Sequence, residues 1–132
     1  MTTHSLRHAV KISADHAKVR ESLTTARGLE HWTAAKVSDQ GAGEWSFKHH
    51  DGPSFIWKIT MHDAETVVWT CLAGPGDAAG TTVTFQLASA ADGWLHLTLD
   101  HDGWPHQEGN FVKCNSLWGM MLHRLRDYAE QR

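Results

Sequence analysis

Cysteine, tyrosine and proline are scarce in this sequence of 132 residues, which holds two cysteines, one tyrosine and three prolines. Two cysteines cannot build a multi-bridge disulfide framework or a four-thiolate metal site. The sequence also lacks any apolar run near the roughly 20 residues that a membrane-spanning helix needs, so we expect no transmembrane helix and no membrane partner. These shortages indicate a globular protein that depends on its own hydrophobic core.

The first residues of the chain lack the apolar segment of a secretory signal, and we therefore expect a cytoplasmic location. Disulfide bonds are unusual in the reducing cytosol. Cys71 and Cys114 are accordingly predicted to be packed thiols. The length is that of one domain over residues 1–132, long enough to bury roughly two thirds of the surface that the unfolded chain exposes.

A surplus of positive charge is also missing, because 12 Lys and Arg stand against 15 Asp and Glu, for a formal net charge of −3. The basic residues are scattered apart from a short group near the C-terminus, so we expect no nucleic-acid partner. Histidine and tryptophan are abundant instead, with eleven and seven copies. Protonation of the histidines at mildly acidic pH would reverse the sign of the net charge.

The N-terminal third predicts one strand and two short helices. Apolar residues alternate over residues 6–12, which indicates a strand, and Ser13 is suited to cap a helix over residues 14–24 with its hydroxyl. Gly28 is predicted to end or bend this helix. A second short helical turn is predicted at residues 29–32, before the chain becomes extended.

The middle of the chain predicts an antiparallel meander. Short runs of alternating apolar and polar residues are separated by turns rich in Gly, Asp and Pro, such as residues 51–53 and 74–80. One apolar face recurs in each run, as at Phe55, Trp57 and Ile59. The six predicted strands cover residues 35–40, 44–50, 54–62, 66–72, 81–89 and 94–101.

The last segment, from about Gln107 to the end, predicts a long amphipathic helix of about six turns that covers the apolar sheet face. Its apolar residues recur at steps of three and four. They are Phe111, Cys114, Leu117, Trp118, Met121, Leu122, Leu125 and Tyr128.

Four local stretches sharpen a resemblance to a known superfamily. ISADHAKV at residues 12–19 looks like its strand exit into the first helix, and LTTARGLEHW at residues 23–32 looks like its helix and turn before the sheet. LDHDGW at residues 99–104 is similar to the end of its last strand. Trp118 and the apolar residues after it resemble its C-terminal helix, although the glycine that often precedes this tryptophan is replaced by Leu117.

Together these stretches resemble the START-like superfamily, and within it the branch of the activator of the heat-shock-protein-90 ATPase. The resemblance implies an α+β helix-grip fold: a curved antiparallel sheet of about seven strands, two short helices after the first strand, and a long C-terminal helix across the sheet with a cavity between them. The superfamily includes binding modules, carriers, cyclases and co-chaperones, so the fold alone does not settle the function.

We predict that this cavity binds a small hydrophobic or aromatic molecule. Two histidines, His49 and His101, interrupt the apolar sheet face and can orient a polar group of the ligand or act as general bases. Alternatively each lies half exposed at a strand end, and the large aromatic residues fill the cavity. Trp104 is predicted in the loop before the long helix, where it gates the cavity or simply packs. The predicted ligand-binding residues are His49, Trp57, Phe85, Leu99, His101, Trp104, Phe111, Cys114 and Trp118.

The sequence predicts no catalytic constellation, no metal site and no cofactor. Neither cysteine has a histidine placed beside it by the pattern, and the histidines are not spaced as metal ligands. Two further functions remain open: a cyclase or hydrolase that uses the cavity histidines, and a co-chaperone related to the activator of the heat-shock ATPase. A homodimer through the long helix also remains open.

Overall fold

The computed structural model of the protein describes residues 3–50, 52 and 54–131. The chain forms seven strands, three α-helices and one turn of 3₁₀-helix. In chain order they are β1 (His4–Ile12), α1 (His16–Thr24), α2 (Ala26–Thr33), β2 (Ala35–Gly41), β3 (Glu44–His49), β4 (Ser54–His62), β5 (Thr66–Ala73), η1 (Gly76–Ala78), β6 (Thr82–Ser89), β7 (Leu95–Trp104) and α3 (Asn110–Ala129).

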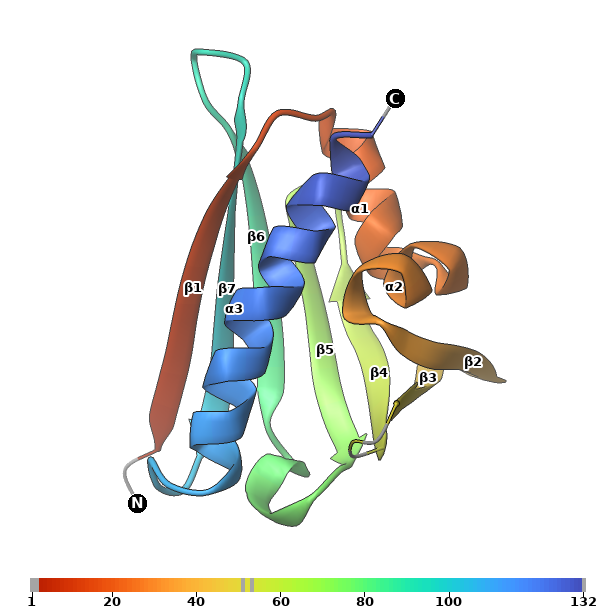
Figure 1. The fold of residues 1–132 in the computed structure, drawn as a ribbon, viewed down its shortest axis with the longest axis vertical. Helices are drawn as coiled ribbons and strands as arrows, with labels where there is room; N and C mark the ends of the chain where they lie inside the picture. Colours follow the sequence, from red (N-terminus) through yellow and green to blue (C-terminus); the bar gives the residue numbers. More distant parts are fainter. Residues whose placement is uncertain (1–2, 51, 53, 132) are drawn as a thin grey trace.

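The seven strands form one antiparallel sheet in the order β1-β7-β6-β5-β4-β3-β2. Strands β2 to β7 are a meander, because each pairs with its neighbour in sequence, and β1 closes the far edge against β7. Helix α3 crosses one face of this sheet, and α1 and α2 lie beside it at the end near β2 (Figure 1). The predicted α+β helix-grip fold is confirmed.

The hydrophobic core lies between α3 and the sheet. Leu122 and Leu125 of α3 are buried, as are the inward residues of β7, Leu97 and Leu99. This burial follows from the alternating pattern of the strands and from the three- and four-residue spacing of the helix. The interior is unusually aromatic, since Trp32, Trp69 and Trp104 are among the largest fully buried side chains.

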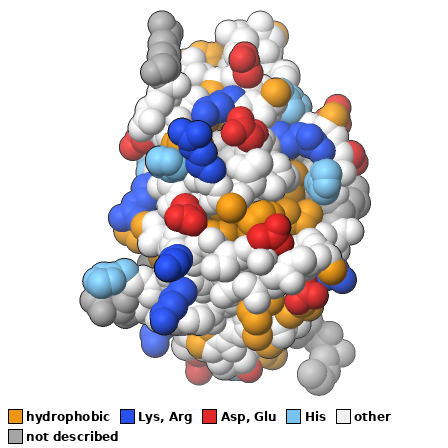
Figure 2. Space-filling model, turned by 90° about the vertical axis from the view of Figure 1, so that its right-hand side faces the viewer, with side chains coloured by type: hydrophobic (Ala, Val, Ile, Leu, Met, Phe, Trp, Pro, Cys, Tyr) orange, Lys and Arg blue, Asp and Glu red, His pale blue; other side chains and the backbone are white. Residues whose placement is uncertain are grey.

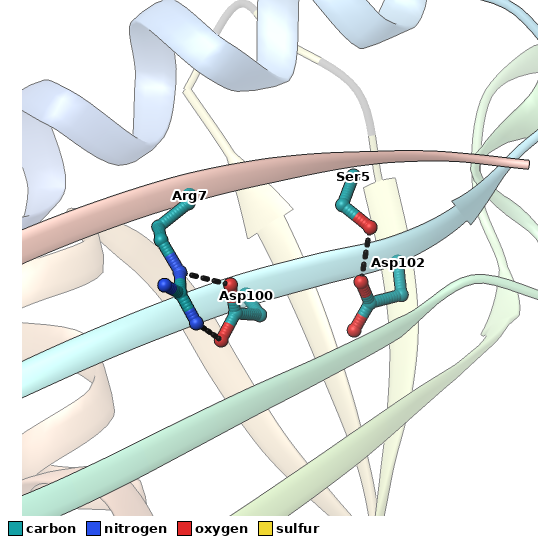
Figure 3. A network of polar contacts seen from close by, with 4 residues as sticks. All are labelled: Ser5, Arg7, Asp100 and Asp102. Carbon is teal, nitrogen blue, oxygen red and sulfur yellow. Dashed lines mark hydrogen bonds and ion pairs between the residues drawn. The ribbon is translucent and has the colours of Figure 1, made fainter.

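The other face of the sheet is open to solvent and carries polar side chains. Arg7 of β1 donates to Asp100 of β7 through Nε at 2.7 Å and through Nη2 at 3.2 Å, and Ser5 donates to Asp102 (Figure 3). The Asp100 carboxylate raises the pKa of the Arg7 guanidinium through this hydrogen bond and its charge. Such exposed pairs help to align the edge strand but add little stability.

Two predicted details of the first helix were wrong. Asp15, not Ser13, occupies the N-cap position, and no side chain caps the helix. The Ser13 backbone N–H instead donates to Glu130 Oε2 at 2.8 Å, across the molecule. Gly28 does not end the helix either, because it lies inside α2; the break falls at Thr25, whose hydroxyl accepts the Gly28 N–H at 3.1 Å.

The remaining boundaries differ by a few residues. Strand β7 continues to Trp104, three residues beyond the predicted end, and α3 begins at Asn110 instead of near Gln107. The loop over residues 74–80 contains the short helix η1, which the sequence did not predict. Two residues of the predicted turn at 51–53, Asp51 and Pro53, lie outside the described residues.

The surface mixes charges of both signs. On the side that carries α1, α2 and β2, acidic, basic and histidine side chains are interspersed with hydrophobic ones (Figure 2). No helix within the described part of the chain is long and apolar enough to cross a membrane.

Candidate functional site

A small cavity lies between the sheet and α3. Its volume of about 20 Å³ is room for about one water molecule. The wall is largely aromatic, and its polar members are two histidines, one threonine and one thiol. The lining residues are Thr33, Phe47, His49, Phe55, Trp57, Trp69, His101, Cys114, Leu117, Trp118 and Met121.

His101 is buried in this wall, with 1% of its surface exposed. Both nitrogens of its ring have hydrogen-bond partners. The Trp118 indole N–H donates to His101 Nδ1 at 2.9 Å, and His101 Nε2 lies 2.8 Å from the Thr81 hydroxyl. The interpretation of His101 as a half-exposed residue at a strand end was wrong, because β7 continues past it and α3 covers it.

These contacts determine the tautomer of His101. An indole nitrogen can only donate, so Nδ1 must accept and the proton of the neutral ring must be on Nε2. His101 Nε2–H then donates to the Thr81 oxygen, and the Thr81 hydroxyl donates to the Ala78 carbonyl at 2.6 Å. Burial lowers the pKa of His101 to about 3. The ring is therefore neutral at pH 7 and has no free nitrogen for a substrate.

His49 differs from His101 in its position, its burial and its hydrogen bonding. It is the last residue of β3, is half-buried, and meets the Phe55 ring edge-on at a centroid distance of 5.8 Å. Burial lowers its pKa, which favours the neutral form. No hydrogen bond to its ring is found among the described residues. General acid or base chemistry in this cavity would thus depend on His49.

The Trp69 indole is a second polar group of the cavity wall without a partner among the described residues; the buried Trp104 N–H also finds none, but Trp104 does not line the cavity. Trp69 lies on β5, is 2% exposed, and packs against Phe85 and Trp118. Its Nε1–H is buried and finds no acceptor in the described part of the chain. A buried donor without an acceptor costs about 1–3 kcal/mol, so a water or a ligand atom in the adjoining cavity is a favourable partner.

The two thiols are buried and free. Burial raises the pKa of Cys71 and of Cys114 to about 11, so both are protonated at neutral pH. Cys114 lies in the cavity wall, but a protonated thiol is a poor nucleophile. The prediction that both cysteines are packed thiols is confirmed.

Thiol labelling checks this arrangement. With DTNB at pH 8, the folded protein is expected to react at least about 100-fold more slowly than the protein in urea, because only the thiolate attacks and the buried thiols are rarely ionised. Both thiols should react once the chain is unfolded. Rapid labelling of one thiol in the folded protein would show that its environment is more open or more polar than described.

The cavity continues into an outer groove of about 340 Å³. Thr33, His49 and Leu117 line both spaces, so they form the boundary between them. Leu117 is half-buried and Met120 is 47% exposed, which places apolar side chains at the entrance. The groove therefore leads from solvent to the aromatic wall.

The structure brings together five of the predicted ligand-binding residues. His49, Trp57, His101, Cys114 and Trp118 all lie in the cavity wall. Their contact with a ligand remains a prediction. Six lining residues are not in the predicted set: Thr33, Phe47, Phe55, Trp69, Leu117 and Met121. The helical stripe already contained the last two, whereas nothing in the sequence distinguishes Thr33 from any other residue at a helix end.

Four predicted residues lie outside the cavity wall. Phe85 and Leu99 are fully buried in the core, and Phe111 packs edge-on against Trp104 at 5.9 Å. The placement of Trp104 in a loop was wrong, because it ends β7, is 1% exposed, and packs on the His101 ring at 4.8 Å. The buried Trp104 ring thus packs against His101 without lining the cavity.

Residues 13–130 match the family model described as activator of Hsp90 ATPase homolog 1-like protein. The chain belongs to this family. The match spans nearly the whole sequence and agrees with the branch that the sequence resembles. No curated protein matches the chain.

Several solved structures share this fold. The Aha1 dimer from Colwellia psychrerythraea is 26% identical, with a TM-score of 0.85 and 96% of each chain covered. Protein MLL2253 from Mesorhizobium loti is 21% identical with a TM-score of 0.78, covering 94% of this chain and 95% of that one. DynU16, from the dynemicin biosynthetic locus, is 22% identical with a TM-score of 0.75, and the match covers 96% of this chain but 47% of DynU16.

Proposed function

We propose that this member of the family binds one small, mainly aromatic molecule between the sheet and α3 and does not transform it. The observation that carries this proposal is the buried Trp69 N–H, which has no acceptor in the described residues and belongs to the cavity wall. We expect the ligand to carry a hydrogen-bond acceptor, such as a carbonyl oxygen, that receives this proton.

The cavity must expand to hold such a ligand. Pockets for drug-sized molecules measure roughly 300–1,000 Å³, far more than the 20 Å³ present here. Leu117 lies on the boundary between the cavity and the outer groove, and Met121 lines the cavity. Methionine in particular adapts its shape readily. We infer that these side chains move outward on binding, which joins the cavity to the groove of about 340 Å³.

A matched pair of probes tests the proposal. 2-Acetylnaphthalene has the acceptor and 2-ethylnaphthalene has the same shape without it. Calorimetric titration is expected to give one site per chain and a roughly 5- to 10-fold preference for the acetyl compound, the usual contribution of one hydrogen bond. The preference should disappear in Trp69→Phe, which keeps an aromatic ring but removes the donor.

The control for this titration is Trp94→Phe, because Trp94 is 37% exposed and does not line the cavity. This variant should retain the preference. If neither probe binds the wild-type chain at one site, the ligand-binding function is wrong. If both bind equally, the ligand site stands but Trp69 does not donate to the ligand.

Membership of the family favours a second candidate function, that of a partner of the Hsp90 ATPase. The similar protein from Colwellia psychrerythraea is described as Aha1 and as a dimer. Adding the chain to an Hsp90 and measuring ATP hydrolysis tests this function, and light scattering tests whether the chain also forms a homodimer. A concentration-dependent rise in hydrolysis would support the co-chaperone role, and an unchanged rate would contradict it.

A further inference from the structure

The entrance to the cavity is rich in positive charge. The outer groove is lined by Thr33, Ala34, His49, His50, Gly52, Leu117, Met120 and Arg124. A second surface groove of about 480 Å³ adjoins it, sharing Ala34, His49 and His50 and adding Lys36 and Lys48. Arg124 thus lies at the entrance, Lys36 and Lys48 line the adjoining groove, and the described lining residues of the two grooves include no carboxylate.

This concentration does not follow from composition, because the chain has a formal net charge of −3. On the side of the molecule that carries α2 and β2, basic and histidine side chains gather along the lower left of the view (Figure 2). Two cations elsewhere in the structure have carboxylate partners. Arg7 pairs with Asp100 and Lys11 pairs with Asp92.

Within the part of the chain that the structure describes, Arg124, Lys36 and Lys48 have no such partner. Arg124 is exposed on α3. An arginine held beside an apolar groove is well suited to bind a carboxylate through two parallel N–H groups. The adjacent lysines add charge without fixed direction.

We infer that the entrance recognises the carboxylate of an amphipathic ligand whose aromatic part enters the cavity. This inference rests on the proposed ligand-binding function and names the class of ligand, an aromatic carboxylic acid. The inference depends on the connection between the inner cavity and the groove that holds Arg124. Thr33, His49 and Leu117 line both spaces. A ligand that passes Leu117 therefore leaves its outer end beside Arg124.

The probes that test this inference are 6-acetyl-2-naphthoic acid and its neutral carboxamide, titrated calorimetrically into the full chain. At about 20 mM salt the acid is expected to bind roughly 3- to 10-fold more tightly than the carboxamide, since each exposed ion pair contributes modestly. The ratio should approach one near 0.5 M salt, where charges are screened over a few ångströms.

Charge-reversal variants make the test specific. Arg124→Glu should invert the ratio so that the carboxamide binds better, and Lys48→Glu should reduce it. Lys113→Glu is the matched control: it changes the net charge equally and lies on the same helix, but it lines neither groove. It should leave the ratio within about twofold of the wild type.

The results of these titrations distinguish a failure of the carboxylate site from a failure of the proposed ligand-binding function. An acid-to-carboxamide ratio that is the same in wild type and Arg124→Glu overturns the carboxylate site and leaves the binding of the aromatic part intact. A ratio that changes as much in Lys113→Glu as in Arg124→Glu overturns it too, because the effect would then be one of overall charge. Failure of both probes to bind wild type overturns the proposed function itself.

Discussion

The Gly28→Ala variant is expected to lose about 2 to 3 kcal/mol of its free energy of unfolding, because the added methyl group has no room. A Cβ atom at Gly28 would lie 2.6 Å from Ser22 Cα and 3.0 Å from the Ser22 oxygen. Both are backbone atoms of α1, so no side-chain rotation relieves the clash. Helices α1 and α2 would have to move apart.

The contact also supports the aromatic core. The Ser22 carbonyl accepts the Trp32 indole N–H at 2.7 Å, and Trp32 packs against Trp69 and Trp118 at centroid distances of 6.1 and 6.3 Å. Displacing Ser22 would disturb this buried hydrogen bond. We therefore expect Gly28→Ala to weaken ligand binding as well as stability, measurable by urea unfolding and by the naphthalene titration.

Gly119→Ala is the matched control for this variant. Gly119 also lies inside a helix, but its Cβ would meet only His8 Cε1, at an ordinary 3.6 Å. Alanine is the better helix former, so a gain of about 0.5 to 1 kcal/mol is expected. If urea midpoints show that Gly28→Ala is as stable as wild type, the close approach of α1 and α2 is wrong.

The free energy of unfolding is expected to fall by about 2 to 3 kcal/mol between pH 6.5 and 4.5 on account of His101 alone. Burial lowers the pKa of His101 to about 3 in the folded protein, against 6.5 for an ordinary histidine. Between these values the unfolded chain binds a proton that the folded chain does not. The full stability is present above pH 6.5, and it decreases with each unit below.

The His101→Gln variant isolates this contribution. Urea unfolding at a series of pH values should give a shallower pH dependence than wild type, by up to about 1.4 kcal/mol per pH unit, because glutamine does not titrate. His96→Gln, on the exposed face of β7, removes a histidine without removing a buried ring and is the control. If the free energy of unfolding depends on pH in the same way in wild type and in His101→Gln, His101 is not a neutral, buried residue.

Most of the fold was predictable from local patterns. Alternation of apolar residues, as at Phe55 and Trp57, makes one face of a strand apolar, and it located all seven strands to within a few residues. The stripe of α3 was equally clear, since Trp118, Leu122 and Leu125 recur at steps of three and four. Periodicity of this kind depends only on backbone geometry, so it survives in the sequence alone.

The candidate site was predictable only in part. Residues that face the sheet interior could be named from the pattern, and His49 and His101 were identified as unusual there. The difference in burial between these two histidines was not predictable. Whether such a histidine is half-buried or fully enclosed depends on which helix lies above it, and Trp118, 17 positions away, is what encloses His101.

By itself, the sequence determined the secondary structure, the apolar faces and hence the fold, because these follow from residue spacing along the chain. Only the tertiary structure decided the rest: the tautomer of His101, the unpartnered Trp69 N–H, the contact at Gly28 and the small size of the cavity. These features arise where elements distant in sequence meet at van der Waals distance. No periodicity along one element encodes how closely another element packs against it.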